Sequence, residues 1–230
     1  MTGTTTTVRA TDQDAGEGRS SSLTRWLLVG AAALIALVLA LVMLTTTGKN
    51  TDQATGVPAI GSPDASFARD MAVHHQQAVE MAYIVRDRTS DEDIRRLAYD
   101  IAQTQANQRG MLLGWLDLWE LPKTFPGGYM TWMQGGHMGH QPKNGSLMPG
   151  MATTAELDRL GRLKGKQAEI LYLQLMIDHH GGGVRMARAC ASQCEVKTAQ
   201  KLAQGMVEGQ QAEIELMTDL LKERGAASRQ

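Results

Sequence analysis

The sequence predicts an all-α protein: a four-helix bundle made of two helical hairpins, preceded by one membrane-spanning helix. Three observations support this fold class. Long segments place apolar residues at helical spacing, no segment alternates like a strand, and the chain repeats itself at an offset of 105 residues. One amphipathic hairpin cannot bury its apolar stripe alone. Two hairpins can bury their stripes against each other, and this favours the bundle.

The first hydrophobic segment is long enough to cross a membrane. Residues 26–44 contain neither a charge nor a proline and match a bilayer core of about 30 Å. Three arginines precede this segment and only Lys49 follows closely, so residues 1–25 are expected in the cytoplasm. A cleaved signal peptide is the alternative, but the apolar core is long and no clear cleavage site follows it. We expect a single-pass cell-membrane protein with its domain on the extracytoplasmic side.

Beyond the membrane, composition and helix signals divide the chain. Residues 45–62 are rich in Thr, Gly, Ser and Pro and predict a flexible linker. The helical domain is expected at 63–224, with repeats of about 63–120 and 154–224 and a Met- and His-rich loop at 122–151. The predicted helices are 63–88, 91–119, 154–190 and 195–224. The predicted N-terminal signals are Ser62 before Pro63, a capping box of Ser90 and Asp93, and a capping box of Thr153 and Glu156.

The repeat aligns chemically distinctive residues, above all two histidine pairs. His74 and His75 coincide with His179 and His180 at the 105-residue offset. Methionines flank both pairs: Met71 and Met81 in the first repeat, and Met176 and Met186 in the second. A methionine three or four residues before a histidine lies on the same helix face. Thioether and imidazole groups can therefore meet on adjacent turns.

These residue types favour copper. Thioether and imidazole ligands together suit Cu(I) better than hard ions that prefer oxygen. All six histidines of the chain lie close in sequence to methionines, including His137 and His140 on either side of Met138 in the loop. The loop residues are weaker candidates because a loop fixes no ligand spacing. The plain alternative is that the methionines fill the core and the histidines form hydrogen bonds.

Cys190 and Cys194 are the only cysteines, at the turn between the third and fourth predicted helices. Outside the cytoplasm they favour a disulfide that closes this turn, with a thiolate metal pair as the alternative. Three glycines at 181–183 follow the second histidine pair, where each costs a helix about 0.5–1 kcal/mol relative to alanine. We interpret them as room for a facing helix or for the loop.

The repeated frame resembles the bacterial domain-of-unknown-function family 305. The resemblance covers about 63–224 and rests on an aromatic residue before Met-x-x-His-His with Met-Ala after it, on Gly150-Met151, and on the QQAEIELM segment from Gln210. It implies a ferritin-like bundle, and some relatives are extracytoplasmic copper-binding proteins. The implied ligands are Met71, His74, His75, Met81, Met176, His179, His180 and Met186.

Three functions are compatible with these patterns. The leading one is copper buffering or sequestration; the others are a ferritin-like metal-dependent oxidase and an interaction module of a membrane complex. Di-iron bundles need inward Glu and Glu-x-x-His groups, which neither histidine-bearing helix has, so an enzyme is disfavoured. A formal net charge of −1 gives no basic surface for nucleic acid. The expected partners are a metal ion, the membrane and possible further copies of the chain.

Overall fold

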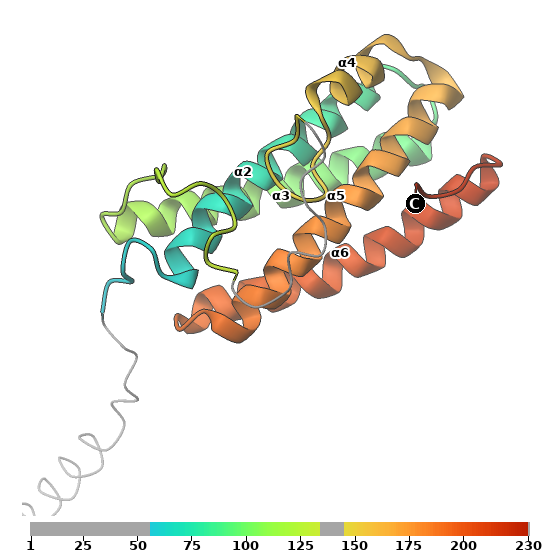
Figure 1. Ribbon diagram of the computed structural model, residues 1–230. Coiled ribbons are helices and arrows are strands. Elements are labelled where there is room, and N and C mark those ends of the chain that lie inside the picture. Colours follow the sequence, from blue (N-terminus) through green and yellow to red (C-terminus); the bar gives the residue numbers. More distant parts are fainter. Residues whose placement is uncertain (1–55, 134–144, 230) are drawn as a thin grey trace, which may run out of the picture. The chain divides into compact units, whose positions relative to one another are not determined.

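Five helices form the part of the chain that this computed structural model describes, residues 56–133 and 145–229 (Figure 1). They are α2 (Pro63–Arg86), α3 (Glu92–Leu118), α4 (Thr154–Arg162), α5 (Gly165–Gln193) and α6 (Lys197–Glu223). These ranges contain no strand, which confirms the all-α class. No helix in them is long and apolar enough to cross a membrane, and the predicted anchor at 26–44 lies outside them.

The helix starts follow local capping chemistry. The Ser62 hydroxyl accepts a hydrogen bond from Ala65 N, with Pro63 in the first turn, and Thr153 and Glu156 form the expected capping box. The predicted box of Ser90 and Asp93 is wrong. Asp91 is the N-cap of α3, and its carboxylate accepts from Ile94 N at 3.0 Å. A carboxylate one residue later thus takes the position expected for the Ser90 hydroxyl.

The predicted helix at 154–190 is two helices. Leu163 and Lys164 are extended, and Gly165 begins α5 at a φ of +52°. The Gly165 amide donates to the Arg88 carbonyl at 2.7 Å, a bond to the end of α2 that a continuous helix would not allow. Glycine adopts this left-handed conformation without strain.

The long helices form two hairpins that meet through their first helices. α2 packs on α3 and α5 packs on α6, while α2 and α5 form the contact between hairpins (Figure 1). α2 and α5 run antiparallel, since the start of α2 contacts the end of α5 and the reverse holds at the other end. The residues in the middle of α2 and α5 therefore form the centre of the bundle.

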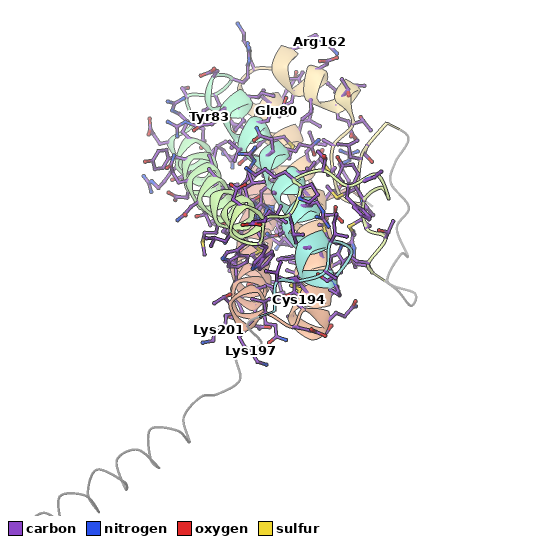
Figure 2. The ribbon with its side chains drawn as sticks, turned by 90° about the vertical axis from the view of Figure 1, so that its left-hand side faces the viewer. Glu80, Tyr83, Arg162, Cys194, Lys197 and Lys201 are labelled. Carbon is purple, nitrogen blue, oxygen red and sulfur yellow. A yellow bond between two sulfur atoms is a disulfide. The ribbon has the colours of Figure 1, made fainter. Side chains whose placement is uncertain are left out.

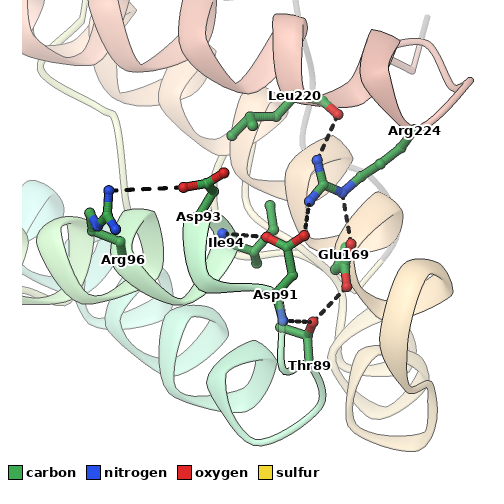
Figure 3. Close-up of polar contacts among 8 residues, drawn as sticks. All are labelled: Thr89, Asp91, Asp93, Ile94, Arg96, Glu169, Leu220 and Arg224. Carbon is green, nitrogen blue, oxygen red and sulfur yellow. Dashed lines mark hydrogen bonds and ion pairs between the residues drawn. The ribbon is translucent and has the colours of Figure 1, made fainter.

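Each hairpin holds the turn of the other through a buried carboxylate. Asp64 at the start of α2 accepts from Glu195 N and Val196 N, 3.0 and 2.9 Å away, just before α6. Its counterpart Glu169, at the start of α5, accepts from the Thr89 hydroxyl just before α3. Arg224 extends this second contact by donating to Glu169 at 2.7 Å (Figure 3). The helix ends thus fix how the two hairpins are placed.

Cys190 and Cys194 form a disulfide where α5 ends, with Cα atoms 4.8 Å apart. Cys194 lies at the end of the molecule opposite Arg162 of α4 (Figure 2). It follows the last turn of α5, and its amide still donates to the Cys190 carbonyl. The bond therefore lies beside the turn that Asp64 holds.

Replacing both cysteines with alanine should lower the free energy of unfolding by about 2 kcal/mol, the loop entropy that so short a cross-link removes from the unfolded chain. Urea denaturation of the oxidised chain and the Cys190→Ala/Cys194→Ala variant measures this. The wild-type chain with its disulfide reduced is the control and should unfold near the midpoint of the variant. Equal midpoints for oxidised wild type and variant would show that the bond does not constrain the unfolded chain.

Candidate metal centre

The four helix histidines lie together where α2 and α5 pack against each other. The rings of His74 and His179 have centroids 3.8 Å apart with 36° between their planes. His179 Nε2 donates to the His74 carbonyl oxygen at 2.9 Å. The ring of His180 is 6.1 Å from that of His179, and all four histidines are completely buried. The two predicted pairs therefore form one cluster at the centre of the bundle.

Hydrogen bonds fix which ring nitrogen carries the proton. His75 Nε2 donates to Gln108 Oε1 at 2.9 Å, and His180 Nε2 donates to Glu213 Oε2 at 2.7 Å. The acceptors of His75, His179 and His180 are an amide oxygen, a carbonyl oxygen and a carboxylate, none of which can donate. In a neutral ring, Nδ1 then keeps its lone pair.

These lone pairs are buried without a partner. The Nδ1 atoms of His75, His179 and His180 have no hydrogen-bond partner among the described residues, whereas the His74 ring lies beside the Pro149 carbonyl. Leaving a buried polar atom unpaired costs about 1–3 kcal/mol, and such atoms are uncommon in folded proteins. An imidazole whose other nitrogen donates to an oxygen is the usual arrangement of a metal-binding histidine.

The surroundings keep three of the imidazoles neutral. Burial, the largest effect, lowers the pKa of His75 to about 3, although its bond to Gln108 acts in the opposite direction. Burial and neighbouring imidazoles also hold the pKa values of His74 and His179 well below 6.5. At neutral pH these rings are therefore unprotonated, the form that binds a metal ion.

The four helix methionines lie on both sides of the histidine cluster. Met71 and Met186 belong to one apolar core cluster, and Met81 and Met176 belong to the other. All four are fully buried. No group of three His, Cys, Asp or Glu side chains in the described ranges could hold a metal ion. A metal site here would thus combine imidazole with thioether sulfur.

The long loop is attached to α2 by two buried polar side chains. Asp70 accepts from Met130 N at 2.8 Å and from Trp132 Nε1 at 2.9 Å. Gln77 both donates to the Ala152 carbonyl and accepts from the Ala152 amide. The loop segments on each side of residues 134–144 therefore lie against the bundle. The weaker candidates His137, Met138 and His140 lie outside the described residues.

The glycines allow the loop backbone and α6 to approach α5 closely. A Cβ on Gly182 would lie 2.2 Å from the Pro149 carbonyl oxygen and 3.1 Å from His74 Nε2. A Cβ on Gly183 would lie 2.4 Å from Gln210 Oε1 of α6. Gly181 is different, since its nearest neighbour would be Arg185 Nη1 at 3.7 Å. The predicted close approach is confirmed for Gly182 and Gly183 and does not apply to Gly181.

Gln108 and Glu213, which accept from His75 and His180, were not predicted from the sequence. Each follows its histidine by 33 residues, and the 105-residue offset aligns one with the other. The repeat therefore contains a signal for them. That signal is weak, because the two residues differ in charge and lie on the neighbouring helices.

Comparisons with known proteins agree with this architecture. The model of the family described as Domain of unknown function (DUF305) matches residues 64–221. The structure of a DUF305 protein from Streptomyces coelicolor is 62% identical, with a TM-score of 0.68, and the match covers 75% of this chain and 99% of that one. A DUF305 fragment from Deinococcus radiodurans is 30% identical, with a TM-score of 0.59 and coverage of 70% and 96%. No curated protein sequence matches the chain.

A third solved structure is CopM in its Cu(I)-bound form. It is 22% identical, with a TM-score of 0.54, and the match covers 70% of this chain and 96% of that one. CopM has also been solved in Cu(II)-bound and Ag-bound forms. At this identity the likeness concerns the fold. The family match and the two DUF305 structures place residues 64–221, histidine cluster included, in one family: the chain belongs to the DUF305 family.

Proposed function

We propose that this protein binds copper, with Cu(I) preferred, and buffers or sequesters it outside the cytoplasm. The observation that carries the proposal is the set of buried histidine nitrogens without hydrogen-bond partners among the described residues at the centre of the bundle. Three of these imidazoles each have Nε2 bonded to an oxygen, and Nδ1 is left as a ligand.

The chemistry of the donor set supports copper over harder ions. Neutral imidazole is the donor at the centre and thioether is the donor in the two apolar core clusters, and thioether sulfur selects Cu(I). The candidate ligands are Met71, His74, His75, Met81, Met176, His179, His180 and Met186. Bound copper would use the nitrogen lone pairs, whose burial is otherwise unfavourable.

The location outside the cytoplasm rests on three arguments. Residues 26–44 have the length and composition of a membrane anchor, with basic residues on the N-terminal side. The disulfide also suits an oxidising compartment. The Streptomyces coelicolor relative is described as a candidate secreted protein.

An oxidase remains disfavoured because neither α2 nor α5 carries a Glu-x-x-His sequence, and the carboxylate bonded to the cluster, that of Glu213, belongs to α6. Glu80, the only glutamate of α2, is exposed at the surface (Figure 2). A di-iron bundle would need such a group directed inward.

Copper titration of the full-length chain tests the proposal. In competition with a chromophoric Cu(I) chelator, the His74→Ala/His179→Ala variant should bind Cu(I) at least about 100-fold more weakly, since it loses two ligands, and loss of one supporting residue already costs 10–100-fold. Gln76→Ala is the matched control, because Gln76 is exposed next to the first pair. Its affinity should equal that of the wild type.

A second variant is needed because alanine at the buried positions 74 and 179 would leave a cavity and could weaken the fold itself. Met71→Leu with Met176→Leu nearly preserves volume and helix propensity, so the fold should persist while both thioethers are lost. We expect weaker Cu(I) binding with an unchanged circular dichroism spectrum. Wild-type affinity in both double variants would disprove a site at the helix crossing. A wild-type chain that folds and binds no copper would favour the interaction module.

A further inference from the structure

His75 and His180, the second histidines of the two pairs, make matching hydrogen bonds but have different charges beside them. His75 and His180 are both completely buried, and each donates through Nε2 to a side chain of the second helix of its own hairpin. In the first hairpin the acceptor is the neutral amide of Gln108. In the second it is the carboxylate of Glu213, whose side chain is 26% exposed.

A second difference lies beside the same carboxylate. Tyr172 on α5 is completely buried, and its hydroxyl has no hydrogen-bond partner among the described residues. Burial raises the pKa of Tyr172, and the negative charge of Glu213 raises it further, so the phenol stays protonated near that carboxylate. The position that the repeat aligns with Tyr172 is Phe67, which has no hydroxyl. The second hairpin therefore has two polar groups, Glu213 and Tyr172, where the first has one amide and a phenyl ring.

A carboxylate behind a metal-binding imidazole acts on the metal through the ring. It fixes the tautomer that presents Nδ1, increases electron donation from that nitrogen, and compensates part of the charge of the metal ion. The Gln108 amide fixes the same tautomer but contributes no charge. Because the attraction between ion and carboxylate grows with ionic charge, a divalent ion gains about twice as much as a monovalent ion.

We propose that the two histidine pairs differ in metal preference: the pair at His180, supported by Glu213, favours a divalent ion such as Cu(II), and the pair at His75, supported by Gln108, favours monovalent Cu(I). This inference rests on the proposed function. Glu213 is a positioning residue in it, which acts through the His180 ring.

Titrations of the full-length chain with two probes test the difference. Cu(II) serves as the divalent probe, measured by calorimetry and by its EPR spectrum, and Ag(I) serves as a monovalent probe that air does not oxidise. Wild type should bind the first equivalent of Cu(II) about tenfold more tightly than the second. In Glu213→Gln that tighter binding should weaken by about 10–100-fold, with a changed EPR spectrum. Its affinity for Ag(I) should change by less than about threefold.

The reciprocal variant is the matched control. Gln108→Glu gives the first pair the support that the second has, and we expect a second tight Cu(II) equivalent with little change in Ag(I) affinity. Both substitutions nearly preserve side-chain shape, and thermal melts of the metal-free variants establish that each is folded.

The outcomes separate this inference from the proposed function. A wild-type chain that binds neither probe contradicts both. A wild-type chain that binds metal while Glu213→Gln weakens Cu(II) and Ag(I) equally, or neither, overturns the inference and leaves the proposed function in place. Failure of a folded Gln108→Glu variant to gain Cu(II) affinity also overturns it.

Discussion

Acidification from pH 7.5 to pH 5.5 should lower the free energy of unfolding of the metal-free chain by about 4 kcal/mol. His74, His75 and His179 are the source, because burial lowers all three pKa values below the ordinary 6.5. Below pH 6.5 the unfolded chain binds protons that the folded chain excludes. The contribution of the three histidines to the free energy of unfolding is therefore complete above pH 6.5. It is lost as the pH falls, by about 1.4 kcal/mol per pH unit for each ring.

Urea denaturation at a series of pH values measures this slope. The variant His75→Gln removes one of the three titrating rings, and its slope below pH 6.5 should be about two thirds of the wild-type slope. Saturating copper should oppose the loss, since a ligand that binds only the folded chain stabilises it. A stability that is constant between pH 7.5 and pH 5.5 would mean that the histidines take up protons in the folded chain.

Gly182→Ala should destabilise the chain by about 1–3 kcal/mol, although alanine is the better helix former. The new Cβ would lie 2.2 Å from the Pro149 carbonyl oxygen and 3.2 Å from Gly150 Cα, and both are backbone atoms. Gly150 itself has a φ of +89°, and a Cβ there would lie 2.5 Å from the Asp178 carbonyl. The loop and α5 thus approach each other at Gly150 and Gly182, and neither position has room for a side chain.

Gly181→Ala is the matched control for this prediction. The neighbouring position offers ordinary contact distances, so the gain in helix propensity should stabilise the chain by about 0.5–1 kcal/mol. Urea denaturation of the two variants should therefore give shifts of opposite sign. If both variants were stabilised to the same extent, the glycines would be a defect in the helix without a role in packing the loop.

Much of the fold could be predicted from local signals. The first, second and last helices end within about two residues of the predicted bounds, because Ser62, Pro63 and the apolar spacing act locally. The break before Gly165 could not be predicted in the same way. It depends on a hydrogen bond to Arg88, which is distant in sequence and close only in the folded chain. The capping error at Ser90 arose because Asp91 offers an equally good acceptor.

The candidate site was predictable in its residue types but not in its geometry. The offset of the repeat identified the histidines and methionines, and symmetry placed the pairs near each other. The close approach of the tilted His74 and His179 rings depends on how α2 and α5 cross, which no residue pattern specifies. The bonds from His75 to Gln108 and from His180 to Glu213 require the hairpin packing as well.

The contacts of Asp64 and Glu169 make the association of the two hairpins symmetric. Asp64 and Glu169 occupy matching positions, and each accepts hydrogen bonds from the turn of the opposite hairpin. The two hairpins are therefore related like the subunits of a two-fold symmetric dimer, except that the residues between α3 and α4 join them covalently. Subunits of a homodimer must carry the same residue at matching positions. The two halves of one chain need not, and this allows Gln108 and Glu213 to differ where the repeat aligns them.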